Sequence, residues 1–367
     1  MNPAMAPATA PRSRESQHRV LVHSQDDHEP RVIQGSELAS EFVAGDLLVV
    51  NDAATFPASL RARRKTGERV ELRFFPNPSA GPGVTSEWEA LVFGEGSWRD
   101  RTEDRPRVEL ELGEKLEVEP DLSLEILDFQ HASPRWVILK FSRPDERVWS
   151  ALYRLGRPVQ YSYLQREIEV WDVQNLYSAR PWASELPSAG RILGDALWEK
   201  LIRRGVRVVA LTHSTGISST GDAELDRHLP APEYYEIPSR TAQAIEESRV
   251  GGRRVIAVGT SVVRALESQA RLHPLSTLLP GSAWTGLIVG ADHQRRVVDG
   301  ILTGVHDVTE SHFRMLECFV DREVLDRISD RASAAGLLSH EFGDSVLVLG
   351  SGKMTQVSTG SRRTPFR

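Results

Sequence analysis

The sequence has little cysteine, no long apolar run and no excess of positive charge, and each absence narrows the class of protein. Its single cysteine, Cys318, cannot form an internal disulfide, and no Cys/His spacing offers a structural zinc site, so a reducing compartment is expected. No run of about 18 apolar residues is present, and residues 1–17 lack the apolar stretch of a secretory signal. The sequence therefore predicts a cytoplasmic protein with no membrane partner.

The charge balance is slightly acidic, with a formal net charge of −6. Dedicated RNA-binding proteins usually present a net basic surface to phosphates, so this balance argues mildly against nucleic-acid binding. A local basic patch for phosphates at Arg61–Lys65 is the alternative, although such clusters are more often solvated faces. With 367 residues, 40% of them hydrophobic, the chain is long and apolar enough for two domains, or for one domain that carries a large insertion.

The spacing of apolar residues changes twice along the chain. Residues 59–142 contain short segments of alternating apolar and polar residues, which is typical of a small antiparallel barrel or sandwich. Residues 19–58 and 143–354 instead contain apolar strands and amphipathic helices, which predict a mostly parallel α/β sheet. We therefore expect an α/β domain interrupted by an inserted β-barrel. Residues 1–18 and 355–367 are expected to be disordered tails.

Two predicted strands end in turns with polar groups. His213 follows an apolar strand and is either a catalytic base or a structural histidine. Gly259 and Thr260 lie between a strand and a helix, where free N–H groups and the helix dipole favour a ligand; an ordinary capped turn is the alternative. Ligands of α/β proteins usually bind at this edge of the sheet.

Two further segments carry chemically capable side chains. Glu233 precedes two tyrosines, and a carboxylate beside aromatic faces suits a cation such as a sulfonium; a surface turn is the alternative. His306 and His312 are six residues apart, a spacing that fits no common metal pair, so no metal is expected. The LGSGK segment lacks the first glycine of a phosphate-binding loop, and no G-x-S-x-G motif is present.

Seven short blocks between about Gly45 and Leu349 resemble, in the same order, the S-adenosylmethionine:tRNA ribosyltransferase-isomerase family. The blocks are GDLLVVNDAATFPASL, VQNLYSARP, LPSAG, HLPAPEYYEI, VIAVGTSVVRALES, VVDGILTGVH and FGDSVLVL, of which VIAVGTSVVRALES is the strongest. Residues that match the family's blocks include Pro57, His228, Glu267, Gly300, Gly343 and Asp344.

The resemblance implies transfer of the ribosyl part of S-adenosylmethionine to 7-aminomethyl-7-deazaguanine in tRNA, with rearrangement to an epoxycyclopentane and loss of adenine and methionine. It implies no metal, and no cofactor other than S-adenosylmethionine as co-substrate. The sulfonium acidifies the adjacent 5′ C–H, so a positioned base can start the rearrangement. We take His213, His306 and Glu233 as candidate catalytic residues. The candidate S-adenosylmethionine-binding residues are Asn51, Asp52, Gln174, Tyr177, Pro187, Ser188, Ala189, Gly190, Gly259, Thr260, Arg264, Asp299 and Thr303.

Departures from the family pattern gather around the same blocks. Arg191–Leu193 replace the LHF of PTAGLHF, Ala54 replaces an arginine, and the HLPKS turn becomes the longer HDVTES. The changed positions are polar or positively charged in the family and suit phosphate or base recognition. Three hypotheses remain: the family reaction on tRNA, an enzyme of the same fold that cleaves S-adenosylmethionine or transfers a fragment of it to a small molecule, and a non-catalytic S-adenosylmethionine- or RNA-binding protein.

Overall fold

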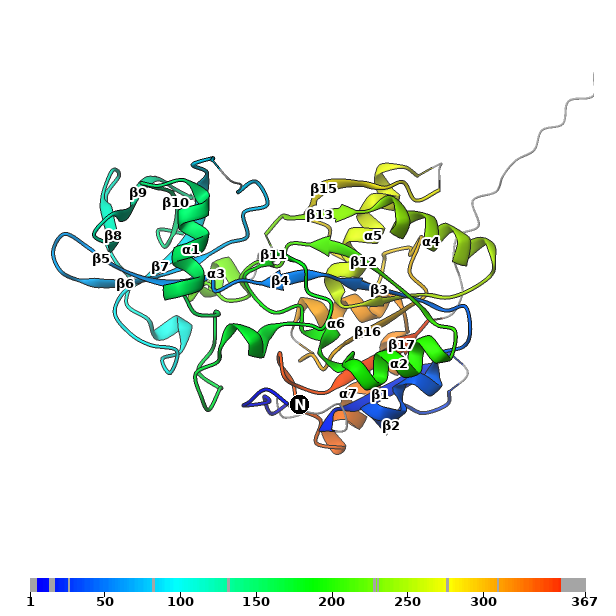
Figure 1. The fold of residues 1–367 in the computed structure, drawn as a ribbon. Coiled ribbons are helices and arrows are strands. Elements are labelled where there is room, and N and C mark those ends of the chain that lie inside the picture. The colour runs from blue at the N-terminus through cyan, green and yellow to red at the C-terminus, as the bar shows by residue number, and fades with distance from the viewer. Residues whose placement is uncertain are drawn as a thin grey trace, which may run out of the picture.

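The chain forms a sheet with helices on both faces and, beside it, a β-barrel (Figure 1). This description rests on a computed structural model. The model describes residues 5–12, 17–25, 27–80, 83–130, 133–226, 229, 231–274, 277–308 and 310–350. Among these residues, no helix combines the length and the apolar character needed to cross a bilayer.

The larger sheet has nine strands in the order β15-β13-β12-β3-β14-β16-β17-β1-β2. Their bounds, in that order, are Gly281–Thr285, Glu233–Ile237, Arg207–His213, Leu47–Asn51, Val255–Val258, Gly300–Gly304, Ser345–Leu349, Arg19–Ser24 and Arg31–Gln34. The four neighbours β12, β3, β14 and β16 are parallel. The pairs β12–β13, β13–β15, β16–β17 and β1–β2 are antiparallel, so the predicted parallel sheet is its centre, and the whole sheet is mixed.

Strand β3 lies at the centre because both of its faces are apolar. Leu47 and Val49 pack into one core with residues of α4 (Ser239–Val250), α5 (Thr260–Leu272), α6 (Ser311–Met315) and α7 (Arg322–Ala334). Leu48 and Val50 pack into a second core with α2 (Asp195–Arg203) and the 3-10 helices η2 (Gly35–Glu41) and η5 (Ser188–Ile192). Apart from Asn51 at its end, β3 has no polar position, which is the pattern expected of a sheet covered on both faces.

The barrel is closed by six antiparallel strands in the order β10-β7-β6-β5-β8-β9. Strands β5 to β10 span Ser59–Arg63, Arg69–Phe74, Glu87–Phe93, Lys115–Glu119, Leu122–Phe129 and Trp136–Phe141. Alternating residues such as Leu60, Leu72 and Leu124 fill one apolar core, and α1 (Asp145–Leu155) adds Val148 and Leu152 to it. The alternation in this part of the sequence therefore does correspond to a barrel.

The barrel also contains a buried ion cluster. Glu71 accepts hydrogen bonds from Arg73 Nε at 2.8 Å and from Arg105 Nη1 at 2.6 Å. Burial raises the pKa of Glu71, but the two guanidinium groups outweigh it and hold the pKa at about 2. Arg73 is 1% exposed, so its charge depends on this carboxylate for compensation.

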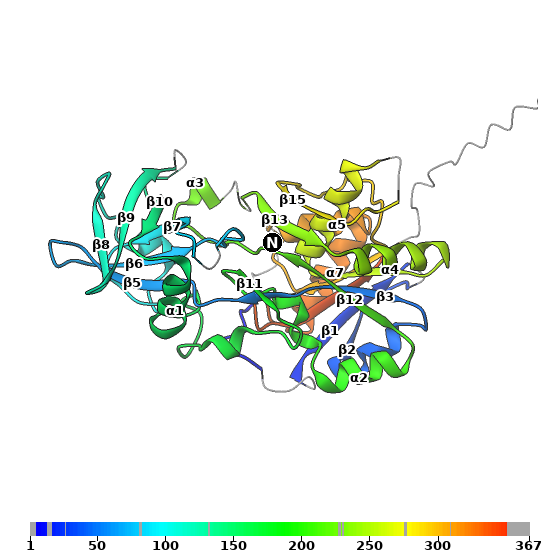
Figure 2. The same ribbon diagram turned by 45° about the horizontal axis from the view of Figure 1, so that its top comes forward.

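The chain passes between the two parts through β4 (Ala53–Thr55), which follows β3 directly and pairs in parallel with β11 (Arg180–Ala183). Figure 2 shows β3 and β4 as one extended path from the sheet toward the barrel. The remaining short helices are η3 (Thr102–Asp104), η4 (Val170–Val173), α3 (Ala223–Asp226) and η6 (Leu316–Cys318).

Residues 5–12 contact the rest of the chain, although residues 1–18 were expected to form a disordered tail. The side chain of Ala8 is buried, and its N–H donates to the carbonyl of Ser339 at 3.0 Å. Arg12 forms an ion pair with Asp344 at 2.5 Å. Sequence alone gave no sign of these contacts, because a Pro/Ala-rich segment is ordered here by residues more than 300 positions away. The expected tail 355–367 lies outside the described residues.

Candidate active site

Polar side chains gather where the parallel strands β3 and β12 end. Asn51 Nδ2 donates to the carbonyl of His213 at 2.9 Å, and the His213 N–H donates to Asn51 Oδ1 at 2.9 Å. Thr212 donates its hydroxyl to Asp52 Oδ1 at 2.6 Å, and burial raises the pKa of Asp52. Asn51 and Asp52 therefore hold two strand ends in register at the edge where α/β proteins bind ligands.

The His213 ring is buried, and neither ring nitrogen has a hydrogen-bond partner among the described residues. Its Nε2 lies 3.8 Å from Glu233 Oε2. Burial, followed by the charge of Arg264, lowers the pKa of His213 to about 3, so the ring is neutral at pH 7. A buried polar atom without a partner costs about 1–3 kcal/mol, so a ligand that supplies the partner would be favoured here.

Glu233, on β13, is held from two sides. Its Oε2 pairs with Arg264 Nη1 from α5, and its Oε1 accepts the N–H of Gly216 at 2.9 Å. Arg264 also donates to the carbonyls of Leu287 at 3.0 Å and Thr285 at 3.2 Å. Burial raises the pKa of Glu233, while Arg264 and the Gly216 N–H oppose that rise. The carboxylate expected to face a cation thus already has a cationic partner within the chain.

The N-terminus of α5 lies beside η5. Gly259 caps the helix with φ 101° and ψ 154°, a conformation that essentially only glycine adopts. A side-chain carbon on Gly259 would lie 3.4 Å from Ala189 Cβ. Gly259, Thr260 and Ala189 are therefore neighbours, and the 13-residue helix directs its positive dipole end toward them.

Of the remaining predicted binding residues, Tyr177 lies against η5, and Gln174 contacts β4. The Tyr177 hydroxyl lies against Gly190, where an added Cβ would come within 1.8 Å of it. Asn175 donates to the carbonyl of Pro187 at 2.9 Å, directly before Ser188. Gln174 accepts from the Thr55 N–H at 3.3 Å and donates to the Thr55 carbonyl at 2.7 Å, which is a structural clamp.

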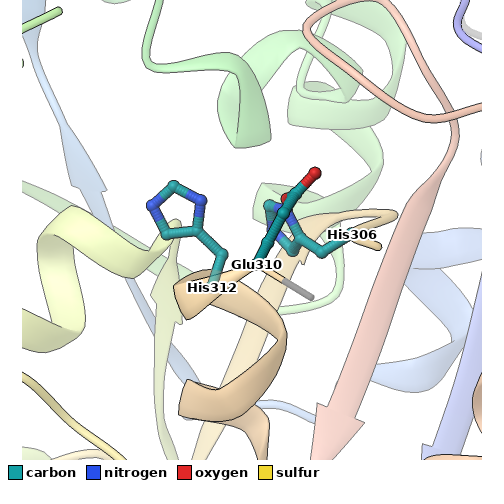
Figure 3. A group of neighbouring side chains, drawn as sticks. All are labelled: His306, Glu310 and His312. Atoms are coloured by element: carbon teal, nitrogen blue, oxygen red, sulfur yellow. The ribbon is translucent and has the colours of Figure 1, made fainter. Parts of the chain in front are cut away.

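Thr303 and His306 lie at the carboxyl end of β16. The Thr303 hydroxyl and His306 Nε2 are 2.9 Å apart, and His306 Nδ1 is 3.1 Å from Glu310 Oε2. The rings of His306 and His312 have centroids 5.0 Å apart (Figure 3). His306 and His312 are therefore close in space, although their separation of six residues in the sequence fits no common metal pair. His306, Glu310 and His312 form the one group among the described residues whose side chains could hold a metal ion.

Asp299 does not join the other candidate residues. It precedes β16, and its Oδ2 accepts the N–H of Val255 at 2.8 Å at the start of β14. Both positions belong to the amino ends of these strands, at the opposite edge of the sheet from His213. Strand polarity explains this position, because a residue that precedes a strand lies at the far edge, and its assignment as a binding residue stays a prediction. His228, the other family-matched residue near Glu233, lies outside the described residues.

Two residues of this region were missed. Ser261, the second residue of α5, has its Oγ 3.4 Å from Asn51 Nδ2. Glu310 was not singled out, although a carboxylate four residues after a histidine gives a usable sequence signal when the two lie on the same turn. Ser261 reaches the site from the first turn of α5, and Glu310 from the residue before α6.

The family model and the similar known proteins point to the same family. The model of a family described as queuosine biosynthesis protein matches residues 2–348. The S-adenosylmethionine:tRNA ribosyltransferase-isomerase of Gloeobacter violaceus is 30% identical and covers 93% of this chain and 92% of its own length. The enzyme of that name from Acaryochloris marina is 31% identical over 90% of this chain and 87% of its own length.

A solved structure supports the fold. The crystal structure of an S-adenosylmethionine tRNA ribosyltransferase from Thermotoga maritima aligns with a TM-score of 0.51. It covers 95% of this chain and 98% of its own chain at 22% identity. The arrangement of an α/β sheet with an inserted barrel is therefore shared with that protein.

Proposed function

The chain belongs to the queuosine biosynthesis protein family, and we propose that it is an S-adenosylmethionine-dependent ribosyltransferase-isomerase that acts on tRNA. In this reaction the ribosyl part of S-adenosylmethionine is transferred to 7-aminomethyl-7-deazaguanine and rearranged, and adenine and methionine leave. Relatives across the whole chain are named as this enzyme, which favours catalysis over a non-catalytic binding protein. We place the reaction in the cytoplasm.

The observation that carries this proposal is the cluster of His213, Glu233 and Arg264 beside the N-terminus of α5. Glu233 and Arg264 neutralise each other, so the cluster presents no net charge that would repel a sulfonium. Gly259 leaves room for a ligand to approach the backbone of the helix N-terminus, which suits the carboxylate of the methionine part.

His213 is the better supported base. Both of its ring nitrogens lack a hydrogen-bond partner among the described residues, so one of them is free to accept the proton. Glu233 Oε2, 3.8 Å away, would stabilise the imidazolium that forms when His213 takes the 5′ proton. His306 is the rival, but its two ring nitrogens already contact Thr303 and Glu310.

A second candidate is cleavage or fragment transfer of S-adenosylmethionine without tRNA, and one contact favours it. Arg191, which stands in the family-divergent segment, donates to the carbonyl of Asp172 at 2.6 Å. Its guanidinium lies 5.3 Å from the centroid of the Phe342 ring. A guanidinium bound in this way supports the chain fold and is less available to an RNA phosphate.

One experiment separates the two candidates. The purified chain is incubated with S-adenosylmethionine alone, and then with tRNA that carries 7-aminomethyl-7-deazaguanine, and adenine and methionine are followed by mass spectrometry. The proposed function predicts release only with the modified tRNA, together with a mass increase of that nucleoside. Release without RNA supports the second candidate, and no release in either mixture contradicts both.

A further inference from the structure

The turn between β16 and α6 brings together three side chains that are typical metal ligands. His306, Glu310 and His312 each offer one ligand atom, and these three atoms all lie within 4.8 Å of one another. Figure 3 shows the three labelled side chains rising from the same turn, with His312 at the start of α6. None of the proposed steps of the ribosyl transfer uses Glu310 or His312.

We propose that His306, Glu310 and His312 bind a divalent transition-metal ion, and that Zn²⁺ fits this set of ligands best. Two imidazoles and one carboxylate are a ligand set that zinc uses in sites with an open fourth position. Mg²⁺ and Ca²⁺ prefer oxygen ligands, so two histidines argue against them. The proposal adds a metal site to the proposed function and does not depend on it.

The surroundings of His306 orient its ring for this role. Its Nε2 lies 2.9 Å from the hydroxyl of Thr303, and its Nδ1 points toward Glu310. When Thr303 accepts the Nε2 proton, the Nδ1 lone pair is free for a metal, as in sites where a second partner fixes the tautomer of the ligating histidine.

Only a small rearrangement would complete the site. Ligand atoms of a tetrahedral zinc site lie about 3.3 Å apart, given zinc–nitrogen bonds of about 2.0–2.1 Å. His306 Nδ1 and Glu310 Oε2 are already 3.1 Å apart. The side chains of His306 and Glu310 are 17% and 38% exposed, so an ion can reach them from solvent.

A metal here would also decide between the two candidate bases. The Nδ1 of a metal-bound His306 has no free lone pair, and its Nε2 is committed to Thr303. His306 would then position the ion, and removal of the 5′ proton would remain with His213.

Metal binding is tested on the full chain without a polyhistidine tag. The protein is stripped with a chelator and titrated with Zn²⁺ by calorimetry, and bound zinc is counted by mass spectrometry. We expect one zinc ion per chain in the parent. In Glu310→Gln and in His312→Ala the affinity should fall by more than about 100-fold, because losing even an outer-shell partner costs about 10–100-fold. The exposed His28, in the turn between β1 and β2, supplies the matched control His28→Ala, which should bind as the parent does.

Co²⁺ gives a readout that does not depend on the variants. Co²⁺ bound to the parent should show the intense visible absorption of a four- or five-coordinate site rather than the weak bands of the hydrated ion. Equal zinc affinity in the parent and Glu310→Gln, or no binding by the parent above buffer, would overturn the proposal. Circular dichroism of each variant separates loss of ligands from loss of fold.

Discussion

At the level of single residues, the proposed site for the sulfonium depends on the charge balance around Glu233. Glu233 and Arg264 are both largely buried, and each compensates the other's charge. If Glu233 is neutralised, Arg264 remains as an uncompensated cation close to the place proposed for the positive sulfur.

We expect Glu233→Gln to weaken S-adenosylmethionine binding by about 1.5–3 kcal/mol, the usual value of a lost charge-assisted contact. Calorimetric titration measures the change. Glu236→Gln is the matched control, because Glu236 lies on the same strand and pairs with the partly exposed Arg180 at 2.7 Å. Unchanged affinity in Glu233→Gln would remove the proposed role of this carboxylate.

His213→Ala should slow both adenine release and hydrogen–deuterium exchange at the 5′ position by about 10²–10⁴-fold, as expected for loss of a general base. His306→Ala is the comparison, and it should retain the 5′ exchange. If the effects are reversed, the base is His306.

The pH dependence of the same exchange reaction gives an independent check. Because burial lowers the pKa of His213 to about 3, its ring stays neutral as the pH falls from 8 to 5. The exchange rate should therefore show no loss in this range that is due to protonation of the base. A decline centred near the ordinary histidine pKa of about 6.5 would contradict this assignment.

Among the structural elements, the start of α5 depends on one backbone conformation. Gly259 has φ 101°, so Gly259→Ala should lower the free energy of unfolding by about 1–3 kcal/mol, and it should also disturb ligand binding at the helix N-terminus. Urea denaturation measures the first effect. In Gly286→Ala the added Cβ would meet nothing within 4 Å, and this variant should be close to the parent.

The barrel depends on its buried ion cluster. Glu71→Gln leaves Arg73 and Arg105 without their carboxylate and should cost about 3–5 kcal/mol of unfolding free energy in urea. Since the pKa of Glu71 is lowered to about 2, its contribution is complete above about pH 4.5 and is lost as the pH falls toward 2. Glu119→Gln, at an exposed pair with Arg154, should change stability little.

The elements that sequence predicted well are those with a regular apolar pattern. The alternation from Leu60 onward predicted the barrel, and the continuous apolar runs predicted β3 and β14. The edge strands were not predictable in the same way. Tyr234 and Glu236 face away from the buried Tyr235 and Ile237, a short half-buried pattern that also fits a turn. Strand β15 consists of the weak strand sequence GSAWT.

In the candidate site, too, the residues on regular strands were easier to predict than those on irregular segments. The place of His213 at the carboxyl edge of the sheet could be predicted, because the ends of parallel strands meet there. Residues joined by irregular turns could not: Glu310 reaches His306 through the turn before α6, and the Arg264–Glu233 pair requires the antiparallel β13 next to β12. The sequence records which residues follow strands, but not which strands become neighbours.

For the whole molecule, one partly buried carboxyl group makes the folding free energy depend on pH. Glu185 follows β11, accepts the hydroxyl of Tyr161, and accepts the N–H of Ser218 at 2.9 Å. Burial raises the pKa of Glu185 to about 7. The folded state therefore retains a proton that the unfolded chain releases near pH 4.5.

The contribution of Glu185 to stability should consequently fall as the pH rises from about 4.5 to about 7, by on the order of 2–3 kcal/mol, and it should change no further above pH 7. Buried histidines with lowered pKa act in the opposite direction, so the contribution of Glu185 is read as the difference between the parent and a Glu185 variant. Glu185→Gln keeps an oxygen that accepts from Tyr161 and Ser218, and it should gain stability relative to the parent as the pH rises through this range. Urea denaturation across this pH range measures both chains. The exposed Glu199→Gln, in α2, should keep the parental slope; a parental slope in Glu185→Gln would contradict the raised pKa.

The central place of β3 has a consequence for synthesis on the ribosome. Its hydrogen-bonding neighbours, β12 and β14, are translated more than about 150 residues after it, a delay on the order of ten seconds at typical rates. During that time the barrel, whose six strands pair only with each other in the closed barrel, can complete its own hydrogen bonding. Strand β3, apolar on both faces, has to wait unpaired, so it is the segment of the nascent chain that most needs protection by a chaperone.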